Sequence, residues 1–206
     1  MKKKTIQIIF ITTLSFYYNN ASSQIGLQLS YIKPSGLYGY YFKPSLGTEL
    51  FYKFHDYEEK FNMGLSLGFY KPKPRLDTFP DYNIQYSNGT YTLLPGYMIY
   101  KNYFFISIGI ISEYKFLDTK LTPLVGLDVN VNMHNFDYEN YIETAKDIGY
   151  SGEQVEIAIV PRIGIKYELE KTWVFSAGIG KSMGYVSNNS KQSYWKPYIS
   201  VCYYYQ

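Results

Sequence analysis

Apolar residues alternate with polar or small ones at a period of two through nearly the whole chain after residue 24. The segment 61–70 is the clearest example, because Asn, Gly and Ser separate five apolar side chains: Phe61, Met63, Leu65, Leu67 and Phe69. A period of two places the two sets on opposite faces of a β-strand. The chain is therefore predicted to be all-β, with each strand apolar on one face.

Nine segments share this pattern and have lengths that suit a tilted strand crossing a bilayer. They are 24–31, 46–54, 61–70, 90–100, 103–112, 121–133, 155–168, 172–182 and 194–205. Single-chain bacterial barrels have an even number of strands. Nine segments therefore predict eight strands, if one strand has been split into two segments or one segment is not a strand. They predict ten strands if a further strand is hidden at 79–86.

The connections between the segments carry turn residues. Tight hairpins are predicted at Lys101-Asn102 and Glu170-Lys171. Longer polar loops are predicted at 34–36, 71–88, 134–154 and 187–192. One or two helical turns fit around 139–147, the only place for a helix in the chain that follows the N-terminal segment.

The N-terminal segment has the layout of a secretory signal. Lys2, Lys3 and Lys4 precede a mostly apolar stretch over 6–17, and Ala21 and Ser23 supply the small residues that a signal peptidase reads. An amphipathic first helix is the alternative. We expect cleavage before Gln24, which divides the chain into a signal peptide, 1–23, and a barrel domain, 24–206.

The charge and cysteine content exclude several classes of protein. The chain has 20 Lys and Arg against 17 Asp and Glu, and loss of residues 1–23 removes three Lys and leaves 17 of each sign. This balance gives no indication of nucleic-acid binding. Cys202 is the only Cys, so no internal disulfide can form. No apolar run of about 18 residues follows the signal, so spanning helices are excluded.

Alternation alone fits a soluble, lipocalin-like barrel as well as a membrane barrel. The non-apolar face favours the membrane, because it combines Gly, Ser and Asn with isolated charges of both signs. Small residues fit a crowded barrel interior, where the charges can pair. The candidate charge network of the lumen is Glu49, Lys53, Asp128, Arg162, Lys166 and Lys196.

Aromatic residues also favour the membrane. The chain has 26 Tyr and 13 Phe, and many lie at or near segment ends, among them Tyr31, Tyr52, Phe69, Trp173 and Trp195. Aromatic rings at both rims are typical of the level of the lipid headgroups.

The signal, the alternating strands and the final Tyr203-Tyr204-Tyr205-Gln206 together resemble small outer-membrane β-barrel proteins of Bacteroidota-like bacteria. The resemblance is architectural and covers the chain from residue 24 onward. It implies a closed antiparallel membrane barrel of about eight to ten strands. An aromatic-ended last strand further implies insertion by the general barrel assembly machinery, although the last residue here is Gln206.

Candidate chemistry is sparse, and we predict no catalytic site, metal site or cofactor. Gly178 to Ser182 resembles the tail of a phosphate-binding loop, but Phe175 replaces the required Gly and no helix follows. His55 and His134 are the only imidazoles, and surface loop polarity explains the grouping of His134 with Asp137 and Glu139 better than a metal does. Cys202 is interpreted as an inert buried thiol.

The leading functional hypothesis is a non-enzymatic barrel with a structural or loop-mediated role in the cell envelope. Outer-membrane lipid and, through exposed loops such as 134–154 or the Tyr-rich stretch 37–42, envelope proteins are the expected partners. A narrow channel or small-ligand-binding barrel is the second hypothesis, an outer-membrane enzyme that modifies lipids or cleaves proteins the third, and a soluble secreted lipocalin-like binder the fourth. The sequence leaves the oligomeric state open.

The signal predicts that protein purified from membranes begins at Gln24. N-terminal sequencing or intact mass measurement tests this directly. Purified protein that still carries residues 1–23 would contradict the prediction.

Overall fold

The computed structural model describes residues 23–54, 60–87, 89–142, 145–169, 172–186 and 191–205. Its elements are β1 (Ser23–Ser35), α2 (Gly36–Tyr41), β2 (Ser45–Lys53), β3 (Phe61–Tyr70), β4 (Phe79–Ser87), β5 (Thr90–Lys115), β6 (Leu121–Ile142), β7 (Ala145–Leu169), β8 (Trp173–Val186) and β9 (Lys191–Tyr205). The signal peptide predicted for 1–23 lies outside the described residues up to residue 22 and stays a prediction.

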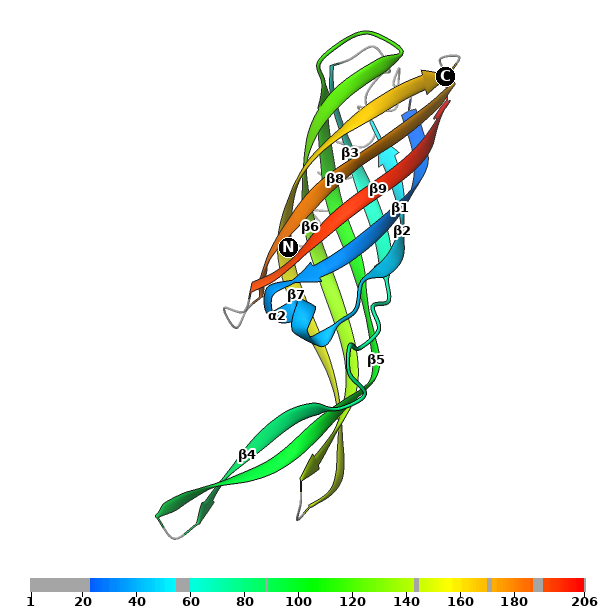
Figure 1. The fold of residues 1–206 in the computed structure, drawn as a ribbon. Coiled ribbons are helices and arrows are strands. Elements are labelled where there is room, and N and C mark those ends of the chain that lie inside the picture. The colour runs from blue at the N-terminus through cyan, green and yellow to red at the C-terminus, as the bar shows by residue number, and fades with distance from the viewer. Residues whose placement is uncertain are drawn as a thin grey trace, which may run out of the picture.

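Eight of these strands form a closed antiparallel barrel (Figure 1). Each strand pairs with its neighbour in the order β3-β2-β1-β9-β8-β7-β6-β5, and β3 pairs with β5 to close the ring. Closure leaves no free sheet edge in the wall, which is the condition for a β-structure to cross a membrane. The predicted closed all-β barrel is confirmed, with eight strands.

The register fixes the tilt of the strands. A path that starts at Ile25 and steps from each residue to its paired residue on the next strand goes once around the barrel. It returns to β1 at Ser35, so the stagger of the barrel is ten residues. The route passes through Tyr52, Leu65, Ile110, Val129, Ile159, Met183 and Ser193. Such a stagger forces the strands to lean by about 35–45° from the barrel axis, and Figure 1 shows them running obliquely.

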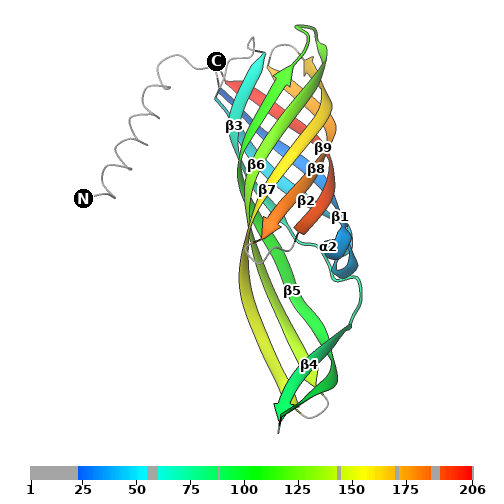
Figure 2. The same ribbon diagram turned by 90° about the vertical axis from the view of Figure 1, so that its left-hand side faces the viewer.

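The two ends of the barrel differ. Ser23 pairs with Tyr205, so the chain enters β1 and leaves β9 at the same end, where the turn at 116–120 is short. We call this the short-turn end. The opposite end carries α2, β4 and the extended hairpin of β6 and β7, which project beyond the wall (Figures 1 and 2). We call this the long-hairpin end.

Strand β5 corrects three sequence-based predictions. The segments 90–100 and 103–112 form one strand, and Lys101-Asn102 is an irregularity in the register and not a hairpin. A bulge shifts the alternation by one residue, so in the sequence it looks like a strand boundary. The hidden strand at 79–86 exists as β4, but it pairs with β5 beyond the barrel and is no part of the wall.

The helix predicted around 139–147 is wrong, because β6 and β7 continue through that region up to Ile142 and from Ala145. The predicted loop 134–154 is therefore largely a strand pair. The one helix in the described part of the chain is α2, where the sequence predicted a loop beginning at 34–36. Gly36 has a φ of 61°, which lets the chain turn sharply from β1 into α2.

The alternation sorts side chains between the outer wall and the lumen. On β3, Leu65 is 48% exposed on the outside, whereas Ser66 is 7% exposed inside. Gly47 shows how tightly the inside is filled, since a Cβ atom there would lie 2.0 Å from the ring of Tyr70. Polar and small residues line the lumen and apolar residues the exterior, the reverse of a soluble barrel.

The two faces of β3 predict different responses to substitution. Leu65→Arg places a cation in the apolar wall and should lower the free energy of unfolding by about 2–4 kcal/mol. Leu65→Ala should cost less than the roughly 2–5 kcal/mol of a close-packed core, because lipid fills the space. Ser66→Arg should overfill the lumen at about 1–3 kcal/mol. Urea unfolding in liposomes measures the free energy of unfolding of all three variants. A loss of about 2–5 kcal/mol for Leu65→Ala, as in a close-packed core, would mean that Leu65 packs against protein.

Candidate functional site

The lumen holds a four-residue charge cluster from four strands. On β2 and β5, Lys53 Nζ lies 2.6 Å from Glu113 Oε1. On β7 and β6, Arg162 Nε lies 2.9 Å from Asp128 Oδ1, and Arg162 Nη2 lies 3.4 Å from Glu113 Oε2. Glu113 is thus shared by two cations, and all four side chains are buried. Buried charges of this kind persist only when they are paired.

A second pair joins β9 and β2, the two strands that flank β1. Lys196 Nζ lies 2.5 Å from Glu49 Oε1. Gln28 and Ser30 donate to the same oxygen at 2.9 and 3.1 Å, and the Tyr70 hydroxyl donates to it as well. Glu49 Oε1 therefore accepts hydrogen bonds from four side chains. The pleat explains this, because residues of adjacent strands that face inward converge on a narrow axis.

The six residues predicted for the lumen all lie inside the barrel, where different partners hold them. Asp128 and Arg162 contact each other, and Lys53 joins them through Glu113. Lys196 pairs with Glu49, and Lys166 lies 3.5 Å from Glu168 Oε1 and 3.5 Å from the Tyr204 hydroxyl. Sequence reasoning missed Glu113 because the predicted strand ended at 112, although Glu113 continues the inward alternation of β5.

The space between these charges is small. A cavity of about 10 Å³ is bordered by Gln28, Glu49, Phe51, Lys53, Ser66, Ile111, Glu113, Asp128, Arg162, Ser176 and Ser200. That volume holds about one water molecule. At this level the side chains fill the lumen, as expected for a barrel of eight strands.

His134 lies at the long-hairpin end of the lumen and not in a surface loop, which corrects the sequence-based interpretation. It is 2% exposed, with Nε2 2.7 Å from Glu156 Oε2 and Nδ1 2.6 Å from the Tyr103 hydroxyl. No Ser, Thr or Cys hydroxyl or thiol bonds this ring among the described residues. The reason for the error is that β6 continues past residue 133 and keeps His134 on its inward face.

Asp137 and Glu139 do not approach His134. Glu139 lies on the outer face of the projecting part of β6, where its carboxylate is 2.9 Å from Lys101 Nζ. The hydrogen bond from the Tyr141 hydroxyl and the neighbouring Lys101 lower the pKa of Glu139 from its usual value. Within the described ranges, no three His, Cys, Asp or Glu side chains are grouped to hold a metal ion.

Helix α2 closes the long-hairpin end of the lumen. Tyr38 and the following Phe42 are buried in an aromatic cluster with Tyr70, Phe105 and Tyr194. Phe42 stacks on Tyr103 with ring centroids 4.0 Å apart, and the Tyr103 and Tyr38 hydroxyls lie 3.3 Å from each other. The helix therefore acts as a plug above His134. The Tyr-rich stretch 37–42, considered as a partner-binding loop, contributes much of this plug.

The remaining sequence candidates gain no chemistry from the fold. Cys202 is buried, with Sγ 3.6 Å from Gln24 Oε1. Gly178 to Ser182 runs through strand β8, which is followed by no described helix. His55 lies outside the described residues. Across the described residues no helix has the length and apolarity needed to span a membrane.

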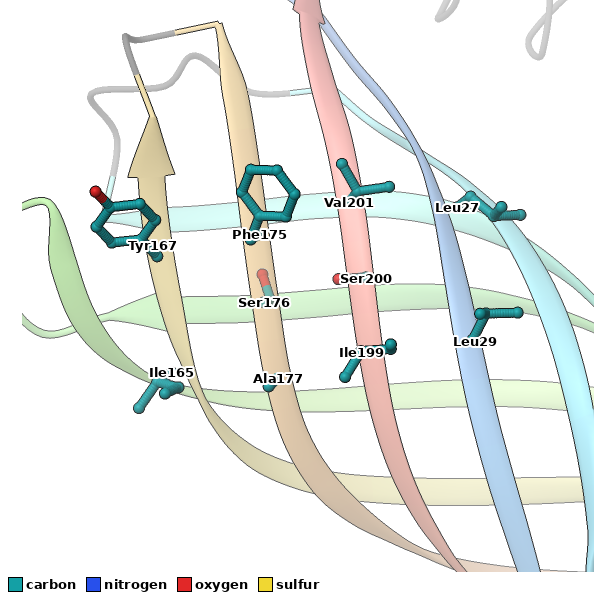
Figure 3. A pocket seen from close by; sticks show the side chains of 10 residues that line it. All are labelled: Leu27, Leu29, Ile165, Tyr167, Phe175, Ser176, Ala177, Ile199, Ser200 and Val201. Atoms are coloured by element: carbon teal, nitrogen blue, oxygen red, sulfur yellow. The ribbon is translucent and has the colours of Figure 1, made fainter.

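The outer wall has one broad apolar hollow on β7, β8, β9 and β1 (Figure 3). Its volume is about 480 Å³, and Ala177 lies among longer side chains that include Leu29, Ile165, Phe175 and Ile199. The hollow offers no charged group to a ligand. It is the kind of surface that lipid tails contact when a barrel wall faces a bilayer.

A second hairpin, formed by β4 and the first part of β5, also projects beyond the wall and carries a different exposed surface. Tyr82 on β4 and Tyr91 and Leu93 on β5 are 64%, 75% and 64% exposed. Further toward the barrel, Tyr97 stacks on Tyr141 of β6 at a centroid distance of 4.7 Å. Exposed tyrosines of this kind suit recognition of a partner at low entropic cost.

Comparison with known proteins identifies the fold class. No known protein family and no curated protein matches the sequence. Among solved structures, the fold is similar to that of Neisserial surface protein A, with a TM-score of 0.60, 14% identity, and coverage of 91% of this chain and 100% of that one. The chain has the fold of the small bacterial outer-membrane β-barrels.

Two further structures match with lower scores. The N-terminal β-barrel domain of Pseudomonas aeruginosa OprF has a TM-score of 0.43 and 11% identity, over 90% of this chain and 100% of that one. A major outer membrane protein from Thermus thermophilus has a TM-score of 0.44 and 11% identity, over 89% of this chain and 99% of that one.

Because Glu113 pairs with both Lys53 and Arg162, we predict that its negative charge stabilises the barrel. Glu113→Gln should lower the free energy of unfolding by about 3–5 kcal/mol, because Lys53 and Arg162 lose a buried counter-charge. The double variant Glu113→Gln with Lys53→Met should lose less than the single variant. Glu139→Gln, which breaks the solvent-accessible pair with Lys101, is the control and should cost about 0–1 kcal/mol. Equal unfolding midpoints for the Glu113 and Glu139 variants would contradict this.

Proposed function

We propose that this protein is a non-enzymatic outer-membrane barrel that presents its long-hairpin end to the cell exterior and has a structural or interaction role in the envelope. The observation that carries the proposal is the distribution of side chains: an apolar outer wall around a lumen filled by paired charges and plugged by α2. A wall of this kind suits lipid, and a filled lumen leaves the projecting hairpins as the surface for contacts.

The orientation rests on loop length. Barrels of this class have short turns on the periplasmic side and longer loops outside. Here the projecting strands and α2 are at the end opposite to the entry of β1 and the exit of β9 (Figure 2). The proposal includes export through the predicted signal and an origin in a Bacteroidota-like bacterium.

The proposed partners are outer-membrane lipid and envelope components that contact the hairpins. Tyr82, Tyr91 and Leu93 form the most exposed part of that surface. The balanced charge predicted for the chain without its signal argues against nucleic acid as a partner.

Two alternatives have specific weaknesses. A soluble lipocalin-like binder needs an apolar interior, whereas Glu49, Asp128 and Arg162 lie inside and Leu65 outside. A narrow channel has the charged lumen in its favour, since charged side chains can line a polar path. The cavity of about 10 Å³ between those charges is too small for a hydrated ion to pass without rearrangement.

Fractionation and conductance test the proposal together. We expect the protein in the outer-membrane fraction and, after reconstitution in planar bilayers, no steady ion current, because side chains fill the lumen. A current that changes with Lys53→Gln would favour the channel, and recovery in the soluble fraction alone would refute the membrane location.

For the β4–β5 hairpin, Tyr82→Ser with Leu93→Ser should reduce cross-linking to envelope components and leave insertion unchanged. Asp118→Asn at the short-turn end is the matched control.

A further inference from the structure

Four Lys-Pro pairs meet at the long-hairpin rim of β1, β2 and β3. Lys33-Pro34 lies near the end of β1, Lys43-Pro44 directly before β2, and Lys71-Pro72 and Lys73-Pro74 directly after β3. In every pair the lysine is exposed, whereas the proline is buried or half-buried. We call these four lysines, together with the exposed Arg75, the cationic rim.

Proline explains why the cations face outward together. Its ring fixes its own φ and disfavours the helical region for the residue before it, so the chain stays extended. Successive side chains of an extended chain point to opposite sides. With Pro72 buried and Pro74 half-buried toward the barrel, Lys71, Lys73 and Arg75 point away from it.

Backbone contacts hold the segments of the rim together. The Lys43 amide donates to the Lys73 carbonyl at 2.8 Å, and the Arg75 amide donates to the Tyr41 carbonyl at 2.8 Å. Phe42 and Pro74 form a bridge between the same two segments. The register places Ile32, directly before Lys33, opposite Ser45 of β2. The five cations are therefore carried by neighbouring strands in a fixed arrangement.

The cationic rim lies at the border of the apolar wall that faces the long-hairpin end. Lys33 follows the outward Tyr31 by two residues, and Lys71 follows the outward Phe69 by two residues. Each of these two lysines is thus the next outward side chain after an apolar one. In a bilayer, the lipid headgroups would begin at this level, on the long-hairpin side of Tyr31, Leu46 and Phe69.

The structure, as far as it describes the chain, shows no ion pair in this part of the rim. Within the described residues, no carboxylate forms an ion pair with any of the five cations, and the exposed Asp77 near Arg75 is also unpaired. The acids of the same end, such as Glu139 and Glu153, are carried by β6 and β7 across the barrel, and Lys101 is already paired with Glu139. Five cations without counter-charges leave a strong anion-attracting surface.

We infer that the cationic rim binds the phosphate groups of a phosphorylated outer-leaflet lipid, whose acyl chains lie along the apolar wall below. This inference rests on the proposed outer-membrane location and orientation. Each lysine near a membrane surface contributes about fivefold to the affinity for anionic headgroups. The proline-fixed backbone reduces the ordering cost of binding, since the segments are already arranged.

A lipid titration tests the inference. The full mature protein in neutral detergent is titrated with diphosphoryl lipid A, with dephosphorylated lipid A and with inorganic phosphate. The variant Lys33→Gln, Lys71→Gln, Lys73→Gln should bind diphosphoryl lipid A about a hundredfold more weakly and dephosphorylated lipid A as the unchanged protein does. The corresponding triple Lys→Arg variant should retain binding. Lys60→Gln with Lys120→Gln, two exposed lysines at the short-turn end, is the control.

Three results would overturn the inference. They are unchanged affinity of the triple Gln variant, an equal loss for both lipids, and inorganic phosphate binding as tightly as the lipid. Loss of cross-linking to an envelope protein with unchanged lipid binding would assign the rim to a protein partner instead. Circular dichroism and heat-dependent gel mobility verify that each variant is folded. The titration is independent of cell fractionation, so outer-membrane recovery with unchanged lipid binding refutes only this inference.

Discussion

Pairing of β3 with β5 closes the sheet into a barrel, and the other features depend on that closure. Without it, both edge strands would expose unpaired backbone groups, which a bilayer interior does not tolerate. With eight strands and a stagger of ten residues, closure also sets a narrow lumen. Inward positions must then be small, as at Gly47, or must pair with inward side chains of other strands, as Glu49 and Lys196 do.

The narrow lumen accounts for the pairing of charges and for the plug. Glu113 and Arg162 are buried there and largely removed from bulk water, so charged partners on other strands compensate for the lost hydration. At the long-hairpin end, β5, β6 and β7 continue beyond the barrel, and α2 covers the opening with Tyr38 and Phe42. A barrel closed in this way has its contact surfaces outside: the apolar wall, the exposed tyrosines of the hairpin and the cationic rim.

Sequence patterns were most reliable where a bilayer would impose them. Within the wall, period-two alternation puts the apolar side chains of Phe61 to Phe69 on one face, and Glu49 and Arg162 on the face opposite to their apolar neighbours. The small residues and isolated charges of the polar face then favoured that face as the inner one. Beyond the wall, selection for an apolar outer face no longer applies, and the pattern fails. His134 and the strands around it were therefore assigned to a loop, and the bulge near Lys101 was interpreted as a hairpin.

The all-β class, the sets of residues that share a face and the charge balance can be read from the sequence, because they depend only on local periodicity and composition. The contacts between charges required the folded barrel: Glu113 joins Lys53 to Arg162, His134 contacts Glu156, and four Lys-Pro pairs from three separate segments form one rim. Such contacts depend on register and closure, which bring together residues far apart in the chain. Alternation is blind to register, since any shift by two residues preserves the same faces.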